Sequence, residues 1–146
     1  MPLHRETSAG YMTNMAGRLL VRALEKRLAP LGLAPAHMPV LLALEHGAAM
    51  TQKLLAERSS VEQATMAATL NRMERDGLVQ RRPNPEDGRS TLVELTPLAL
   101  EKLPQVEQVA TAINALVLDQ FAPEEREQFF SMMARIIAVL EGEDSA

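Results

Sequence analysis

Residues 51–79 read TQKLLAERSSVEQATMAATLNRMERDGLV, and they contain the pattern from which the fold is predicted. Thr51 is placed to cap a short helix over residues 52–58, because a threonine side chain can accept a hydrogen bond from an unpaired N–H group of a first turn. After a short turn, a second helix over 62–76 stops before Gly77, a residue that tolerates the left-handed conformation found after many helices. Two helices joined by a tight turn indicate a helix–turn–helix.

The segment that follows predicts a β-hairpin. Residues 78–82 and 90–95 read as two strands, and the polar segment 83–88, with its two prolines, predicts the loop between them. A hairpin directly after a helix–turn–helix is the wing of a winged helix–turn–helix. We therefore assign residues 34–96 to a DNA-binding region.

Long amphipathic helices are predicted on both sides of the hairpin and the helix–turn–helix. Apolar residues recur at steps of three and four, which predicts further helices over 11–28, 35–45, 97–121 and 123–140. Pro104 should bend the third of these or delay its start. The outer helices would expose apolar stripes on a monomer, so residues 1–33 and 97–146 are expected to be dimerisation helices. Residues 1–146 then form one domain, mainly α-helical with a small β-hairpin wing.

Composition restricts the classes of function. The 146 residues are 47% hydrophobic but only 3% aromatic, and they include no cysteine, which excludes disulfides and thiolate metal sites. The three histidines lack metal-ligand spacing, so no metal and no cofactor is expected. No apolar run is long enough for a membrane span, and the first residues do not resemble a signal peptide, so a cytoplasmic protein without a membrane partner is expected.

The net charge of −4 is not evenly distributed. Residues 50–96 contain seven Lys or Arg and seven Asp or Glu, whereas the other residues contain eight and twelve. The predicted DNA-binding region is therefore neutral, and contact with DNA has to depend on where individual cations lie.

The helix over 62–76 is the predicted recognition helix. At about 100° per residue, Met66, Leu70 and Met73 fall on one side and should pack inward. Residues near the start of a recognition helix contact base edges, and those further along more often contact phosphates. The predicted contacts are Gln63, Ala64, Thr65, Ala67 and Ala68 for bases and Asn71, Arg72 and Arg75 for phosphates, with Thr51 and Arg82 completing the set.

Arg89 is the predicted minor-groove residue of the wing. An arginine at a hairpin tip can enter a narrow minor groove, where the negative potential is strongest. Asp87 lies two residues earlier. An acid there would repel DNA unless it is paired, so we expect Asp87 to act as a clamp that orients Arg89. The alternative is a solvated loop with incidental charges.

Four stretches of the chain resemble the MarR family (multiple antibiotic resistance regulators). They are APAHMPVLLALEHG, the helix–turn–helix quoted above, RRPNPEDGRSTLVELTP with its Asp87–Arg89 pair, and APEEREQFFSMMARIIAVLE. The resemblance implies a homodimer on a palindromic operator, with half-sites about one helical turn (~34 Å) apart. It also implies a repressor that a small aromatic or phenolic anion releases from DNA.

Three features depart from the family pattern. Ala68 stands where relatives often carry Arg or Asn, so operator preference is expected to differ there. Gly88 lies between Asp87 and Arg89 and should make the wing tip more flexible. The absence of cysteine removes the peroxide-sensing branch of the family.

The same resemblance suggests where an effector would bind. Tyr11, Met15 and Arg18 lie on the first helix, and His37 and Met38 begin the second. Methionines supply adaptable apolar surface, Tyr11 can donate a hydrogen bond, and Arg18 or His37 could pair with a carboxylate. The alternative is that these methionines belong to the core and that His37 is a surface or capping residue.

Three other functions fit parts of the sequence. The regulator could be independent of effectors, or an activator. A small helical enzyme would need a nucleophile with a base, or paired carboxylates, yet the one adjacent His–acid pair, Glu45 and His46, stands at a helix end. A helical protein–protein module is the third alternative, since the DNA-binding region is neutral.

Overall fold

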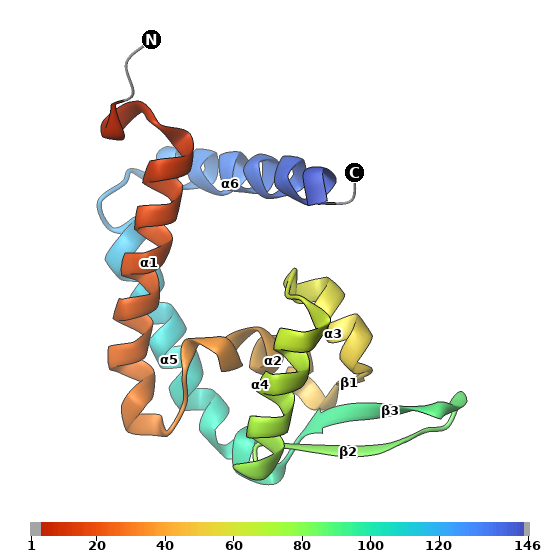
Figure 1. Cartoon of the computed structure of the whole chain (residues 1–146). Coiled ribbons are helices and arrows are strands. Elements are labelled where there is room, and N and C mark those ends of the chain that lie inside the picture. Colours follow the sequence, from red (N-terminus) through yellow and green to blue (C-terminus); the bar gives the residue numbers. More distant parts are fainter. Residues whose placement is uncertain (1–3, 145–146) are drawn as a thin grey trace. The chain divides into compact units, whose positions relative to one another are not determined.

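The computed structural model describes residues 4–144 and divides into two compact units, Met1–Val109 and Ala110–Ala146. The chain is mainly α-helical with one small sheet, as predicted (Figure 1). The helices are α1 (Ala9–Leu28), α2 (Met38–Leu44), α3 (Gln52–Ser59), α4 (Gln63–Arg75), α5 (Pro97–Leu118) and α6 (Pro123–Asp144). The strands are β1 (Ala49–Met50), β2 (Val79–Asn84) and β3 (Asp87–Leu95), and short 3₁₀ segments cover Arg5–Thr7, Ala29–Leu31, Pro35–His37 and Glu45–Gly47.

The three strands form an antiparallel sheet in the order β1-β3-β2. Strand β1 was not predicted, because two residues are too few to show an alternating pattern. Ala49 pairs with Glu94 and Met50 with Val93. β3 is therefore the central strand, and the segment before α3 covers one of its edges.

The wing is longer than the sequence suggested. The expected loop over 83–88 is wrong, because β2 continues to Asn84 and β3 begins at Asp87, which leaves a turn of two residues. Pro83 is paired with Thr91 despite having no N–H group. It is tolerated because β2 is an edge strand, where a proline removes no hydrogen bond from a second neighbour.

The predicted helix ends are largely confirmed. α1 begins at Ala9, two residues before the predicted start, because Ser8 accepts a hydrogen bond from the Tyr11 backbone N–H (3.2 Å). Gly77 has the positive φ (74°) expected after the recognition helix. The expected single helix over 35–45 is wrong, because a 3₁₀ turn precedes α2 and the last turn contains His46 at φ 62°. α5 begins at Pro97, so Pro104 does not delay its start.

The core of the first unit surrounds α4. Met66, Leu70 and Met73 are all buried, which confirms the predicted inward side. They share the core with residues from α1, α2, α3, the sheet and the beginning of α5, including Leu28, Leu41, Leu44, Leu55, Val79, Val93, Ala99 and Val106. The opposite side of α4 is thereby left to face solvent.

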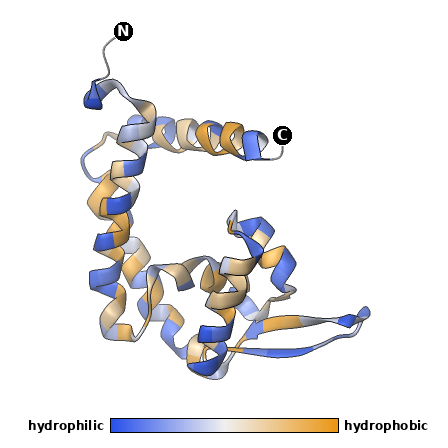
Figure 2. Ribbon diagram, viewed as in Figure 1, coloured by the Kyte–Doolittle hydropathy of each residue, from blue (hydrophilic) through white to orange (hydrophobic). Residues whose placement is uncertain are grey.

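The second unit exposes large apolar side chains along α6. None of the described residues of α6 is buried, and Figure 2 shows hydrophobic residues (orange) in its central turns. Phe121 and Phe129 stack with their ring centroids 6.5 Å apart. The large exposed apolar side chains of this unit are Leu116, Phe121, Phe130, Met132, Ile136, Ile137, Val139 and Leu140.

Within residues 4–144 no single helix is long and apolar enough to cross a membrane. One pair of segments, Ala9–Leu31 and Pro35–Gly47, reaches that length and composition only when taken together, across a bend of 88°.

Candidate nucleic-acid interface

The start of α4 presents the predicted base-contacting residues to solvent. Their side chains are exposed except for Ala67, which is half-buried: Gln63, Ala64, Thr65, Ala67 and Ala68. Ala64 and Ala68 are exposed because they lie opposite the three buried residues of the same helix, and Thr65 lies on the flank between the two sides. Gln63 is exposed because it is the first residue of α4. The helix thus has one polar, accessible side of the kind that a major groove can accept.

The predicted phosphate contacts lie further along the same helix. Asn71, Arg72 and Arg75 are all exposed. Arg75 Nε lies 3.6 Å from the Asp76 carboxylate, a contact in water that contributes little to stability. Asn71 Oδ1 accepts a hydrogen bond of 3.1 Å from Arg81 Nη2 of β2, so the helix and the wing are joined by side chains.

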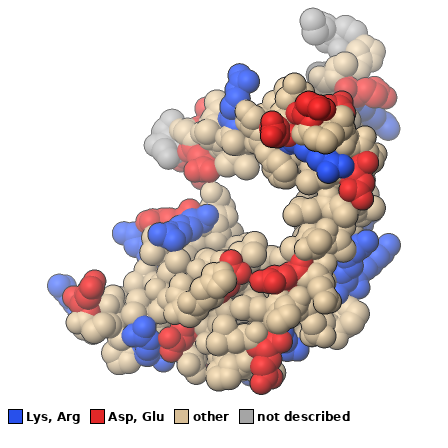
Figure 3. Space-filling model, turned by 180° about the vertical axis from the view of Figure 1, so that it is seen from behind, with Lys and Arg blue, Asp and Glu red and all other residues tan. Residues whose placement is uncertain are grey.

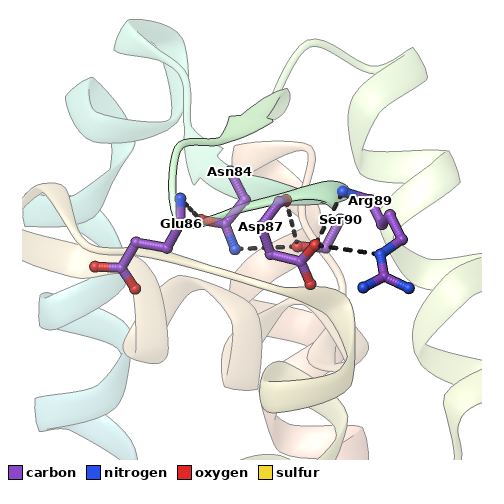
Figure 4. A network of polar contacts seen from close by, with 5 residues as sticks. All are labelled: Asn84, Glu86, Asp87, Arg89 and Ser90. Carbon is purple, nitrogen blue, oxygen red and sulfur yellow. Dashed lines mark hydrogen bonds and ion pairs between the residues drawn. The ribbon is translucent and has the colours of Figure 1, made fainter.

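The tip of the wing is organised by Asp87 (Figure 4). Its Oδ1 accepts a hydrogen bond from the Arg89 backbone N–H (3.0 Å) and lies 3.9 Å from Arg89 Nε. Across the turn, Asn84 Nδ2 donates to Ser90 Oγ (3.0 Å), and Asn84 Oδ1 accepts from the Glu86 N–H (3.0 Å). The side chain of Arg89 is 98% exposed, which leaves its guanidinium accessible to a ligand.

Two other predicted contacts are engaged within the chain. Arg82 Nε lies 3.2 Å from Glu94 Oε2, and Glu94 Oε1 accepts from Gln80 Nε2. Thr51 caps α3, as predicted, by accepting from the Leu54 N–H (3.2 Å). Both side chains support the local structure, whatever they also contact outside the chain.

Basic and acidic side chains are mixed on the face of the molecule that Figure 3 shows. At the tip of the hairpin they lie side by side. This mixture agrees with the equal numbers of basic and acidic residues among residues 50–96. Any attraction for phosphates depends on local placement and not on a broad positive field.

The predicted effector residues do not form one cluster within the first unit. Tyr11, Met15 and Arg18 occupy the first half of α1, and Tyr11 lies about 25 Å from its last residue at about 1.5 Å per residue. His37 and Met38 follow the other end of that helix (Figure 1). The expected meeting of these two groups does not occur within this unit, because α1 is straight and long.

His37 has a structural role. Its ring is buried (5% exposed), and its Nδ1 accepts a hydrogen bond of 3.1 Å from the Ala34 N–H. Burial lowers the pKa of His37; the Asp76 carboxylate opposes this shift, and the Arg72 guanidinium adds to it. A neutral, buried ring cannot serve as a cation for a carboxylate, which corrects the expectation for His37.

Arg81 and Glu94 are polar residues of the interface that the sequence did not single out. Successive residues of a strand point to opposite faces, and Val79 of β2 is buried. Arg81 therefore shares the face that packs on α4, whereas Arg82 lies on the other face. The alternation along β2 could have shown which arginine faces α4. It could not show the partners, because Asn71 lies ten residues from Arg81 in the chain and Glu94 lies twelve residues from Arg82.

Comparison with known proteins agrees with this geometry. The model of the MarR family matches residues 31–90. The chain is 33% identical to the HTH-type transcriptional regulator YwoH of Bacillus subtilis over 82% of this chain and 86% of that protein. A shorter match, 34% identical over 54% of this chain and 47% of the relative, is to the HTH-type transcriptional repressor YetL of the same organism.

Solved structures show the same fold. A mutant MarR from E. coli, complexed with operator DNA, is 25% identical, covers 93% of this chain and 99% of its own, and has a TM-score of 0.83. The PcaV regulator of Streptomyces coelicolor, in complex with its natural ligand, has a TM-score of 0.84 with 94% and 97% covered. At 22% identity the second likeness concerns the fold alone.

The exposed side of α4 and the adjoining wing define a winged helix–turn–helix transcriptional regulator that binds DNA. More particularly, the chain belongs to the MarR family. Its relatives are transcriptional regulators and not enzymes.

Proposed function

We propose that this chain is a homodimeric repressor that binds a palindromic operator. The observation that carries the proposal is that the outer side of α4 and Arg89 at the wing tip are both exposed. The contact between Asn71 and Arg81 joins α4 to the wing. In this arrangement α4 enters a major groove and Arg89 an adjacent minor groove. Bases are read by Gln63, Ala64, Thr65, Ala67 and Ala68, and phosphates by Asn71, Arg72, Arg75 and Arg82.

Dimer formation is the second part of the proposal. Each unit exposes large apolar side chains, including Met12, Leu19 and Val21 of α1 and Met132, Ile137 and Leu140 of α6. Apolar surface of this extent is expected to be covered in water. A second copy of the chain is the natural partner, because a two-fold symmetric dimer also explains recognition of a palindrome.

A small aromatic or phenolic anion is proposed to release the repressor. The PcaV neighbour is described with its natural ligand, which supports a ligand-binding role for this fold. On this chain Tyr11 and Met15 are half-buried and Arg18 is exposed, so the first half of α1 offers an apolar surface with one cation. Met38, at the start of α2, belongs to a different part of the first unit.

Operator binding can be measured without knowing the operator. A duplex recovered from a random-sequence pool by the full chain serves as the probe, and fluorescence anisotropy gives the affinity over a range of salt concentrations. Arg72→Ala with Arg89→Ala should weaken binding and reduce the salt slope by about one for each phosphate interaction that is removed. Unchanged affinity and slope in the double variant would reject this interface.

The effector is tested separately. Calorimetry with a panel of aromatic acids should show binding, and the same acids should displace the duplex. If no acid binds, or if binding leaves the duplex in place, the regulator is independent of this class of effector. The alternative of an activator is distinguished by transcription in vitro from a promoter that contains the recovered site.

A further inference from the structure

We infer that Arg81 is a positioning residue that orients the Asn71 side chain toward DNA. The inference rests on the proposed function. It adds Arg81 as a residue that affects DNA binding through Asn71. It starts from the hydrogen bond between Arg81 Nη2 and Asn71 Oδ1, 3.1 Å long, which joins β2 to α4.

The strand holds Arg81 in place. Arg81 pairs with Val93 of β3, which is buried, so its aliphatic stem lies beside an apolar neighbour on the face of the sheet that packs on α4. Its Nε is buried and has no hydrogen-bond partner among the described residues. A buried donor without a partner is unfavourable, and the guanidinium keeps its Nη2 hydrogen bond to Asn71 at that cost.

The chemistry of the pair decides how the amide is oriented. A guanidinium has donors only, whereas an asparagine amide has an acceptor oxygen and a donor NH₂ group. Asn71 must therefore turn Oδ1 toward Arg81, because the flipped amide would place two donors against each other. The NH₂ group is left for groups outside the chain, and Asn71 is exposed.

An oriented NH₂ group matches the acceptors of DNA. Phosphate oxygens accept hydrogen bonds, and the predicted role of Asn71 is a phosphate contact. Without Arg81 the amide could rotate, and it would have to be ordered on each binding event. The pair also fixes the recognition helix against the wing, so the two DNA-contacting elements keep one spacing.

Arg82 provides a matched comparison on the same strand. It is the next residue and has the same chemistry, but it lies on the opposite face and pairs with Glu94 (3.2 Å). An effect that passes through Asn71 should be seen for Arg81 and not for Arg82.

The test is a double-mutant cycle on the duplex selected by the wild-type chain. Arg81→Met keeps the apolar stem and removes the guanidinium, and we expect about three- to tenfold weaker binding from the loss of one such hydrogen bond. In the Asn71→Ala background the same change should have almost no effect. Arg82→Met should weaken binding by the same factor in both backgrounds.

The salt dependence separates positioning from direct contact. If Arg81 acts only through the uncharged Asn71 side chain, Arg81→Met leaves the salt slope unchanged, whereas removal of a direct contact between a cation and a phosphate would reduce it by about one. Arg81→Gln places an amide, which can either donate or accept, where the guanidinium stood. It no longer fixes the orientation of the Asn71 amide, so it should bind as weakly as Arg81→Met, and it replaces that variant if Arg81→Met does not fold.

Three results would overturn the inference: additive effects of Arg81→Met and Asn71→Ala, a reduced salt slope, or full binding by Arg81→Gln. Failure of the wild-type chain to select any duplex would instead reject the proposed function.

Discussion

Thr96 Oγ1 donates a hydrogen bond of 2.6 Å to the Gly77 carbonyl oxygen, so the end of the recognition helix is tied to the start of α5. The same hydroxyl accepts from the Ala99 N–H (3.3 Å), and the Thr96 N–H donates to the Leu78 carbonyl. One threonine thus caps α5 and fixes the turn that follows α4. Gly77 and Thr96 flank the hairpin in the chain, so the hydrogen bond between them fixes the wing relative to α4.

Thr96→Val should lower the free energy of unfolding by about 1–3 kcal/mol, since it removes a helix cap and leaves the Gly77 carbonyl without this partner. Chemical denaturation followed by circular dichroism measures the change. Thr91→Val is the control, because Thr91 is exposed on β3 and its substitution should change stability by less than about 0.5 kcal/mol. Equal effects of the two substitutions would show that the Thr96 hydroxyl contributes nothing.

Asp87→Ala should weaken operator binding by about three- to tenfold, although it removes a negative charge near phosphates. The reason is that Asp87 Oδ1 holds the Arg89 backbone and lies near its guanidinium. Glu86→Ala is the matched control, because the Glu86 carboxylate points away from Arg89 in Figure 4. Tighter binding by Asp87→Ala would mean that the acid only repels DNA.

Stability should fall as the pH falls below about 6.5, because His37 is neutral in the folded chain. Its pKa is lowered in the folded state, so the unfolded chain takes up the proton first. The contribution is complete above the unfolded pKa and is lost between that value and the lower folded one. Urea unfolding over about pH 5 to 8 measures it.

The matched histidine variants identify the group responsible. His37→Asn keeps an acceptor for the Ala34 N–H and should remove most of this pH dependence, whereas His46→Gln, at an exposed histidine, should retain it. A slope that survives His37→Asn would assign the effect to other groups.

Ile137→Glu should shift the proposed dimer toward monomer. Ile137 is 49% exposed on α6, and burying such a side chain contributes about 1.5–3 kcal/mol. Sedimentation equilibrium gives the dissociation constant, and circular dichroism checks that the helices remain. Gln128→Glu adds the same charge at an exposed polar position of α6 and should leave the dimer intact. A monomeric wild-type chain would reject this interface altogether.

The class of fold and the inner side of the recognition helix were predictable from the sequence. Met66, Leu70 and Met73 recur at helical spacing, and Thr51, Gly77 and Thr96 mark helix ends, so these features depend on neighbours within a few residues. Local patterns of this kind are readable because caps and periodicity are properties of short segments.

Only the tertiary structure decided which polar residues meet. The pairing of Arg81 with Asn71, the two-residue strand β1, the extension of the wing past Pro83 and the burial of His37 all depend on segments brought together by folding. Strand register and side-chain partners are set by packing between elements, which a local pattern does not contain. The exposed side of α4 was therefore foreseen, and the hydrogen bond between Arg81 and Asn71 was not.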